Sequence, residues 1–224
     1  TTTSKFEYHI IANALNPDPF KEHATSVLHI PKSSHFTCIR EILALFETSD
    51  SQYFLLLDSD CWPIRKGWDQ YLIDKLSSFR FAAPVRIENL DVYPHPSAVF
   101  FHRDHLLSID FGYTHKKNLL GNPSSDVGSA MGIDGCFPLL KTNYISPHPV
   151  FASIYGDCFY HHCAGSRSAG VRCSEYYQHM ITPHQQKKIY SFITKALIKS
   201  PMGFINELRG RKRPSLLNCA RNAM

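Results

Sequence analysis

The order of apolar and polar residues predicts strands and helices that alternate along the first part of the chain. Residues 8–15 and 26–30 are short apolar runs bounded by turn-forming residues, as expected of strands. Between residues 36 and 46, apolar side chains recur with the helical period. Residues 53–57 form an unbroken apolar run, which is typical of a parallel strand covered on both faces. This succession predicts the beginning of a parallel α/β sheet.

The later part of the chain continues this pattern with longer interruptions. Helical periodicity predicts helices over residues 67–79 and 185–199, and apolar runs predict strands over 81–85, 98–101 and 158–162. The fold class expected from these elements is α/β, with a Rossmann-like, mostly parallel central sheet flanked by helices.

Two carboxylates stand directly after the apolar run 53–57, at Asp58 and Asp60. The carboxyl ends of strands in open α/β sheets face the ligand crevice, and alternation along an extended chain would point both side chains to one side. Two hard oxygen ligands in this position suit Mg²⁺ or Mn²⁺ bound to a phosphate.

The formal charge of +5 comes from one end of the chain. From Lys187 onward there are nine Lys or Arg and one acid, out of 24 and 19 in total, which leaves 15 basic and 18 acidic residues before it. The body is therefore negative by about three charges, and a nucleic-acid partner is not expected.

Cysteine usage and hydropathy favour a cytoplasmic protein. Seven cysteines without regular spacing fit a reducing compartment better than a disulfide framework. The first residues lack the apolar core of a signal peptide, and no stretch approaches the roughly 20 apolar residues that span a bilayer.

Four segments together resemble the nucleotide-sugar glycosyltransferases of the A-type fold. Asp58-Ser59-Asp60 resembles the Asp-x-Asp motif of that family, and Ala98-Val99-Phe100-Phe101-His102-Arg103 resembles its strand in the acceptor half. Ser125-Asp126-Val127-Gly128 resembles its acidic motif at a helix start, and Tyr160-His161-His162 with Gly165-Ser166-Arg167 resembles its late His segment. The likeness covers roughly residues 7–170. Members usually begin with a further strand and helix, so the fold is expected to lack that first strand or the chain to be a fragment.

The resemblance implies transfer of a sugar from a nucleoside-diphosphate sugar to a hydroxyl of a glycan or lipid-linked acceptor. UDP is the commonest donor nucleotide in such families. Asp60 would bind Mn²⁺ or Mg²⁺, and Asp58 would contact the ribose or a metal-bound water. A neutral imidazole from His161 or His162 would complete the coordination; since neighbouring strand residues face opposite sides, only one of them is expected to reach the metal.

The remaining site residues follow from the needs of the same reaction. An acceptor hydroxyl loses its proton as it attacks, and Asp126 is the candidate base of an inverting enzyme. Arg167 suits bidentate phosphate binding, and Asn13, within the strand expected over residues 8–15, is a candidate for nucleotide binding. The alternatives are a helix cap for Asp126, a surface position for Arg167 and a solvated turn for the two aspartates.

Two other classes remain open, and a third is disfavoured. A phosphatase of the haloacid dehalogenase type also begins with a hydrophobic strand and Asp-x-Asp, but Trp62 stands where that pattern wants Thr or Val. A catalytically silent domain that binds sugar nucleotides would carry the same motifs. A structural zinc site at Cys158, His161, His162 and Cys163 is disfavoured, because consecutive residues cannot easily surround one ion.

The sequence divides into a catalytic domain over residues 1–184 and a basic amphipathic helix and tail over 185–224. An apolar stripe at Ile189, Phe192, Ile193 and Leu197 is flanked by lysines, as in helices that bind membranes peripherally. The alternative is that the stripe packs on the protein's own core. Peripheral membrane binding would place the enzyme at the inner membrane face.

Overall fold

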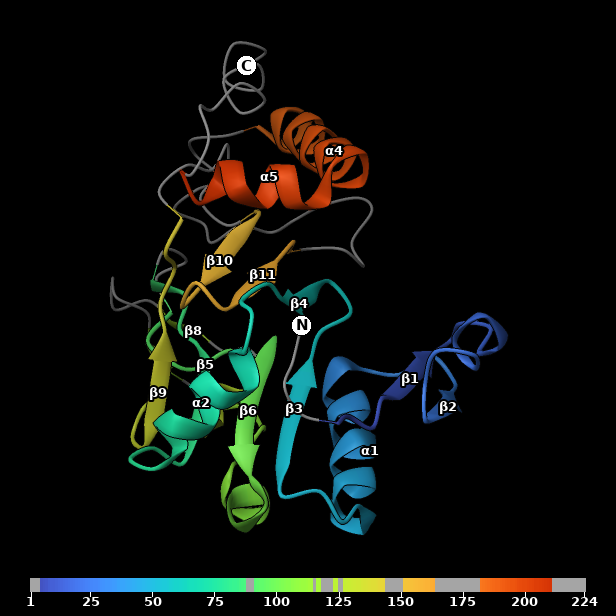
Figure 1. The fold of residues 1–224 in the computed structure, drawn as a ribbon, viewed down its shortest axis with the longest axis vertical. Helices are drawn as coiled ribbons and strands as arrows, with labels where there is room; N and C mark the ends of the chain where they lie inside the picture. Colours follow the sequence, from blue (N-terminus) through green and yellow to red (C-terminus); the bar gives the residue numbers. More distant parts are fainter. Residues whose placement is uncertain are drawn as a thin grey trace.

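A computed structural model describes residues 5–87, 91–114, 116–117, 123–124, 127–143, 151–163 and 182–210. The chain is an α/β protein in which strands pair in several mixed or antiparallel sheets. The largest sheet has the order β3 (Tyr53–Leu57), β6 (Ala98–His102), β5 (Phe81–Pro84) and β9 (Cys136–Leu139), as Figure 1 shows.

The pairing in this sheet differs from the mostly parallel arrangement that the sequence predicts. β6 is antiparallel to both β3 and β5, and only β5 and β9 pair in parallel. The chain passes from β5 to β6 without a crossover helix in its described part, and antiparallel neighbours need no crossover. An apolar run reports that a strand is buried and carries no information on its direction.

Two further strands form a sheet of their own near the N-terminus. β1 (His9–Asn13) and β2 (Ser26–Ile30) pair in parallel, and within the described residues neither pairs with the central sheet. A short 3-10 turn, η1 (Asp18–Phe20), lies between them in sequence. Helix α1 (His35–Thr48) follows β2, and the Ser34 hydroxyl caps it by accepting a hydrogen bond from the Thr37 amide.

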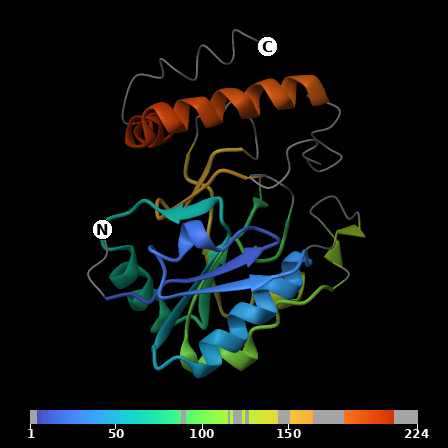
Figure 2. The same ribbon diagram turned by 90° about the vertical axis from the view of Figure 1, so that its right-hand side faces the viewer.

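A third sheet lies between the central sheet and the C-terminal helices. Its order is β10 (Ser153–Tyr155), β11 (Phe159–His161) and β4 (Cys61–Pro63), and both pairings are antiparallel. Helices α4 (Pro183–Lys199) and α5 (Pro201–Leu208) lie beyond it at one end of the molecule (Figures 1 and 2). The remaining elements are α2 (Trp68–Leu76), η3 (Arg103–Ser108), β7 (Lys116–Lys117), β8 (Pro123–Ser124) and η4 (Ser129–Met131).

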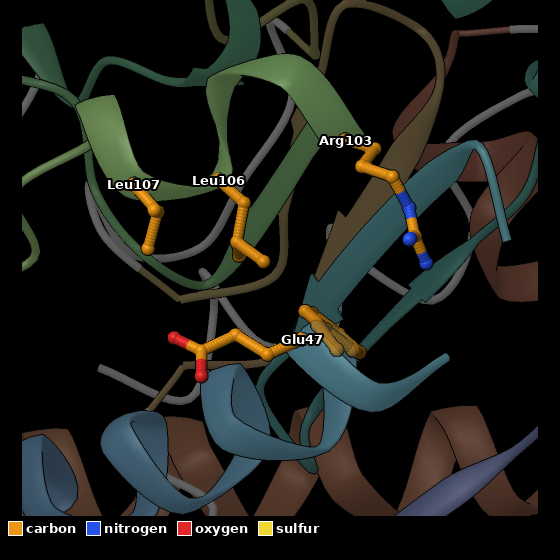
Figure 3. A pocket seen from close by; sticks show the side chains of 5 residues that line it. Glu47, Arg103, Leu106 and Leu107 are labelled. Carbon is orange, nitrogen blue, oxygen red and sulfur yellow. The ribbon is translucent and has the colours of Figure 1, made fainter. Parts of the chain in front are cut away.

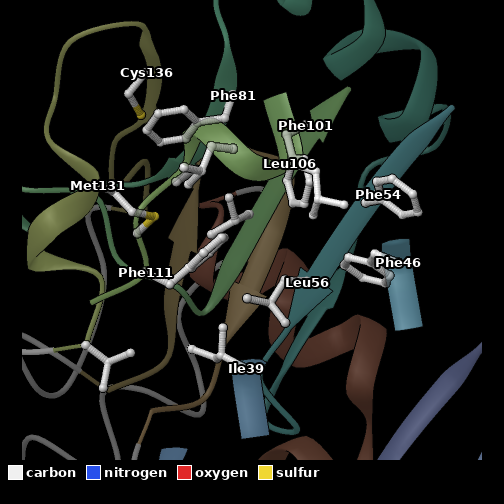
Figure 4. Close-up of a cluster of buried hydrophobic side chains, with 14 residues drawn as sticks. Ile39, Phe46, Phe54, Leu56, Phe81, Phe101, Leu106, Phe111, Met131 and Cys136 are labelled. Carbon is white, nitrogen blue, oxygen red and sulfur yellow. The ribbon is translucent and has the colours of Figure 1, made fainter. Parts of the chain in front are cut away.

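Both faces of β3 are covered, as its apolar sequence predicts. Phe54 and Leu56 point into a cluster that contains Ile39 and Phe46 of α1, and Figure 4 shows these side chains between helix and sheet. The alternate residues Tyr53, Leu55 and Leu57 pack against a second cluster, which Trp68 and Leu72 of α2 join. A strand between two helical layers needs apolar residues at every position.

A third cluster unites the C-terminal helices with the three-stranded sheet. Ile189 and Ile193 of α4 and Phe204 of α5 are buried against Ile154 and Tyr160 of β10 and β11. The apolar stripe of α4 is therefore used inside the protein, and its other members, Phe192 and Leu197, are partly buried there.

The boundary at residue 184 between a catalytic domain and a tail stays a prediction. No helix in the described part of the chain is both long and apolar enough to cross a membrane.

Phe101 tests the importance of the central cluster. Its side chain is fully buried in β6, so Phe101→Ala is expected to lower the free energy of unfolding by about 3–5 kcal/mol. Chemical denaturation followed by circular dichroism measures this change. The control is Leu107→Ala, where 87% of the residue is exposed and a change within about 0.5 kcal/mol is expected. Equal losses in both variants would contradict the assignment.

A candidate metal centre at the junction of two sheets

The residues from Asp58 to Cys61 form a turn that joins the four-stranded sheet to the three-stranded sheet. The Asp58 amide donates to the carbonyl of Ser97, just before β6, and the Cys61 amide donates to the Asp58 carbonyl, both at 3.0 Å. β4 then begins at Cys61, opposite His161 of β11. The His162 amide donates to the Asp60 carbonyl at 2.8 Å. The main chain of Asp58 is thereby held by the four-stranded sheet, and that of Asp60 by the three-stranded sheet.

The side chains of Asp58, Asp60 and His161 converge at this junction. One ligand atom from each lies within 4.8 Å of the others, and His161 Nε2 is 3.3 Å from Asp60 Oδ1. Ligands about 2.1 Å from one ion lie up to about 4.2 Å apart, so small side-chain shifts would let these three share a divalent cation. Two carboxylates and one imidazole also form a donor set suited to such an ion. The residues therefore fit a metal.

The imidazole of His161 has an unusual environment. The residue is 3% exposed, and its Nδ1 atom is buried without a hydrogen-bond partner among the described residues. A buried polar atom left in this way costs about 1–3 kcal/mol.

Two histidines that sequence reasoning missed lie beside the three residues. His35, the first residue of α1, places its Nε2 2.9 Å from Asp58 Oδ1. The ring of His95 is buried and lies 6.0 Å from the ring of His161. His35 carried no signal beyond its place after a helix cap, but His95 stands between Pro94 and Pro96 in a rigid loop, which was a usable hint.

The charges around Asp58 outweigh its burial. Burial alone would raise the pKa of this carboxyl, but the hydrogen bond from His35 and the nearby His35, His95 and His161 hold the pKa below its ordinary value. Asp58 is thus kept ionised. Burial, together with Asp58 and Asp60, raises the pKa of the adjacent Cys61 thiol well above its ordinary value, so this thiol stays protonated.

His162 and Asn13 do not join this group. Both ring nitrogens of His162 are hydrogen bonded, Nδ1 to the Tyr160 hydroxyl at 2.8 Å and Nε2 to the Thr194 hydroxyl at 3.0 Å. The Asn13 amide bonds the backbone of Ser33 at both ends, at 2.9 and 2.8 Å, and so ties β1 to the start of α1. The structure thus brings His161, and not His162, to the two aspartates. Metal binding by His162 and nucleotide binding by Asn13 stay predictions.

Asp126 and Arg167 lie outside the described residues. The two residues after Asp126 are described: Val127 is buried in the cluster under the central sheet, and the Gly128 amide donates to the Phe111 carbonyl at 3.2 Å. Gly128 has a φ of +85° and lies so close to Pro96 that an added Cβ would be 2.9 Å from its Cδ. This segment therefore packs against the loop that carries His95.

A buried ion pair holds the start of that loop. Arg86 Nη2 lies 2.8 Å from Asp91 Oδ2, and both side chains are buried. The His95 amide then donates to the Pro84 carbonyl at 2.7 Å, and the Ser97 amide donates to His95 Nδ1 at 3.2 Å. Removing one partner of a buried pair costs about 3–5 kcal/mol, so this pair is a strong constraint on the loop.

A separate pocket lies at the opposite end of β3 and β6. It is lined by Phe46, Glu47, Arg103, Leu106 and Leu107, as Figure 3 shows. Tyr53 and His102 are paired at that end of the two strands, whereas Leu57 and Ala98 are paired at the end next to Asp58. The pocket is therefore not part of the metal centre.

Comparisons with known proteins give no family for this chain. No family model matches it, and neither a curated protein nor a solved structure does. What can be stated is the class that fold and site define: an α/β protein with a candidate divalent-metal centre formed by Asp58, Asp60 and His161.

The ion pair of Asp58 generates a pH-dependent prediction. Since the folded-state pKa lies below the ordinary value of 3.8, ionised Asp58 stabilises the fold above that pH, and this stabilisation is lost as the pH falls through the folded-state pKa. His35→Ala removes the hydrogen bond, so the pKa of Asp58 should rise and acid unfolding should begin at higher pH. Carboxyl ¹³C titration by NMR of the metal-free protein measures the pKa.

The control for this titration is His102→Ala, at the far end of β6. It should leave the Asp58 titration unchanged. If His35→Ala leaves it unchanged as well, the ion pair does not hold the pKa down.

Proposed function

We propose that this protein is a metal-dependent glycosyltransferase with the A-type fold. It would transfer a sugar from a nucleoside-diphosphate sugar, with UDP as the first nucleotide to test, to a hydroxyl of a glycan or lipid-linked acceptor. The observation that carries the proposal is the convergence of Asp58, Asp60 and His161 at the end of a buried strand. The sequence singled out these three residues from two motifs, the Asp-x-Asp segment and the late His segment.

The donor set favours Mn²⁺ over Mg²⁺. Asp58 and Asp60 supply oxygen ligands that suit either ion, but Mg²⁺ seldom takes an imidazole nitrogen such as that of His161. The bound ion would neutralise the charge that develops on the diphosphate leaving group.

The remaining roles fall to side chains of the chain itself. His35 holds the Asp58 carboxylate in place from the start of α1. Asp126 is the proposed base that accepts the acceptor's proton, which makes the reaction an inverting one. Gly128, two residues further along the chain, lies against Pro96 in the loop of His95. Arg167 is the proposed phosphate ligand, and Asn13, whose amide is occupied by Ser33, would act through its backbone or by shaping the nucleotide pocket.

Nucleotide binding tests the central claim. Calorimetric titration with UDP, GDP, CDP and dTDP should show binding of one diphosphate that requires Mn²⁺. Asp60→Asn removes a charged ligand and should weaken this binding by about tenfold or more, which corresponds to about 1.4 kcal/mol per tenfold. Asp74→Asn, at an exposed position of α2, is the matched control and should bind as the wild type does.

Two outcomes would favour other functions, and a third would refute the proposal. Release of phosphate from simple monoesters would indicate a phosphatase of the haloacid dehalogenase type. Metal-dependent nucleotide binding without sugar transfer to any acceptor would indicate a catalytically silent domain. If no diphosphate binds with metal, or Asp60→Asn binds as well as the wild type, the glycosyltransferase proposal is wrong.

We further propose that contact with an anionic membrane, where a lipid-linked acceptor would lie, uses the corner between α4 and α5. The apolar stripe of α4 is occupied by the core, but Ile198 and Met202 are 75% and 57% exposed next to the exposed Lys195 and Lys199. Exposed apolar side chains among lysines are what an interfacial surface requires. Each lysine near such a surface contributes about 1 kcal/mol.

Vesicle sedimentation tests this surface. The full chain should sediment with vesicles that contain anionic lipid and not with neutral vesicles. Charge reversal at Lys195 and Lys199 to Glu should abolish sedimentation, whereas the same change at Lys5 and Lys21, far from α4 in sequence and exposed, should not. Equal sedimentation of both double variants would refute the proposal.

A further inference from the structure

A continuous chain of side-chain hydrogen bonds connects β11 to α4. The Tyr160 hydroxyl lies 2.8 Å from His162 Nδ1, and His162 Nε2 lies 3.0 Å from the Thr194 hydroxyl. The Thr194 hydroxyl donates to the Tyr190 carbonyl, one helical turn back, at 2.9 Å. The rings of Tyr190 and His162 also meet in a T-shaped contact, with centroids 5.2 Å apart.

The direction of this chain follows from its acceptor end. A carbonyl can only accept, so the single proton of the Thr194 hydroxyl is used on Tyr190. The hydroxyl oxygen must then accept from Nε2–H of His162, and a neutral imidazole has no second proton for Nδ1. Nδ1 accordingly accepts from the Tyr160 hydroxyl. Each donor is used once, and the tautomer of His162 is defined.

The same histidine holds the main chain of the candidate metal centre. Its amide donates to the Asp60 carbonyl at 2.8 Å, and the residue before it is His161. Any displacement of His162 therefore moves the backbone of two of the three ligand residues. Functional sites tolerate only about 0.5 Å of such movement.

We propose that Thr194 and His162 are positioning residues of the metal site: through them, α4 fixes where Asp60 and His161 stand. The inference rests on the proposed metal-dependent function. Loss of partners behind a ligand shell typically weakens metal affinity by about 10–100-fold. Because these hydrogen bonds act on the metal ligands through the backbone, we expect a loss of affinity at the lower end of that range.

Thr194→Val in the full chain provides the test. Valine keeps the shape of threonine but cannot accept from His162 Nε2–H. The dissociation constant for Mn²⁺, measured by the electron paramagnetic resonance signal of the free ion, should rise about tenfold. The nitrogen modulation that a bound imidazole gives in pulsed spectra should weaken. Thr194→Ser keeps the hydroxyl and should restore both values to within about twofold of the wild type.

Two variants complete the design. Thr48→Val removes a hydroxyl that bonds back to its own helix, in α1, and should leave Mn²⁺ affinity unchanged. Tyr160→Phe breaks the chain at its other end without loss of ring volume and should weaken Mn²⁺ binding by a few-fold, so the test survives if Thr194→Val fails to fold.

The outcomes separate the inference from the proposed function. If folded Thr194→Val and Tyr160→Phe both bind Mn²⁺ as the wild type does, these hydrogen bonds have only a structural role and the inference is wrong. Because the probe is Mn²⁺ alone, a wild type that binds the ion but no nucleotide refutes the transferase while leaving this test intact. A wild type that binds no Mn²⁺ refutes both.

Discussion

The backbone of one turn determines how the rest of the site is arranged. Asp58 is bonded through its amide to Ser97, just before β6 of the four-stranded sheet, and Asp60 is bonded through its carbonyl to His162, just after β11 of the three-stranded sheet. Two carboxylates separated by one residue would otherwise be free to point apart in a solvated turn. Here the two sheets hold residues 58–60 from both sides, so that both side chains meet His161.

This arrangement creates an electrostatic problem that the surrounding histidines reduce. Two partly buried carboxylates in close proximity repel each other, and burial adds to the cost of their charges. His35 contacts Asp58 directly, and His95 and His161 lie near enough to favour its ionised form. The candidate site is therefore acidic at its centre and surrounded by imidazoles. It also avoids the full cost of two unpaired negative charges when no cation is bound.

Features that depend on local sequence were predictable, and features that depend on distant segments were not. The run 53–57 became β3 with both faces covered, and the helical period of α1 and α4 matched the structure, because burial and periodicity are local signals. The direction of β6 depends on pairing with two other strands. His35 escaped notice for the same reason, since its contact with Asp58 crosses from one element to another. Of His161 and His162, alternation indicated that one would face the aspartates, but the register of β11 against β4, which joins distant segments, places His161 there.

The distance along the chain between the aspartates and their imidazole partner has a consequence for synthesis. Asp58 and Asp60 leave the ribosome roughly a hundred residues before His161, and α4 follows later still. β4 has no described partner other than β11, so this short strand has nothing to pair with until then. The central sheet up to β6 can form before the third sheet exists, and the junction between them closes in one of the last steps. A nascent chain would therefore display two carboxylates without the geometry to retain an ion. Capture of the proposed metal would then follow folding and would not direct it.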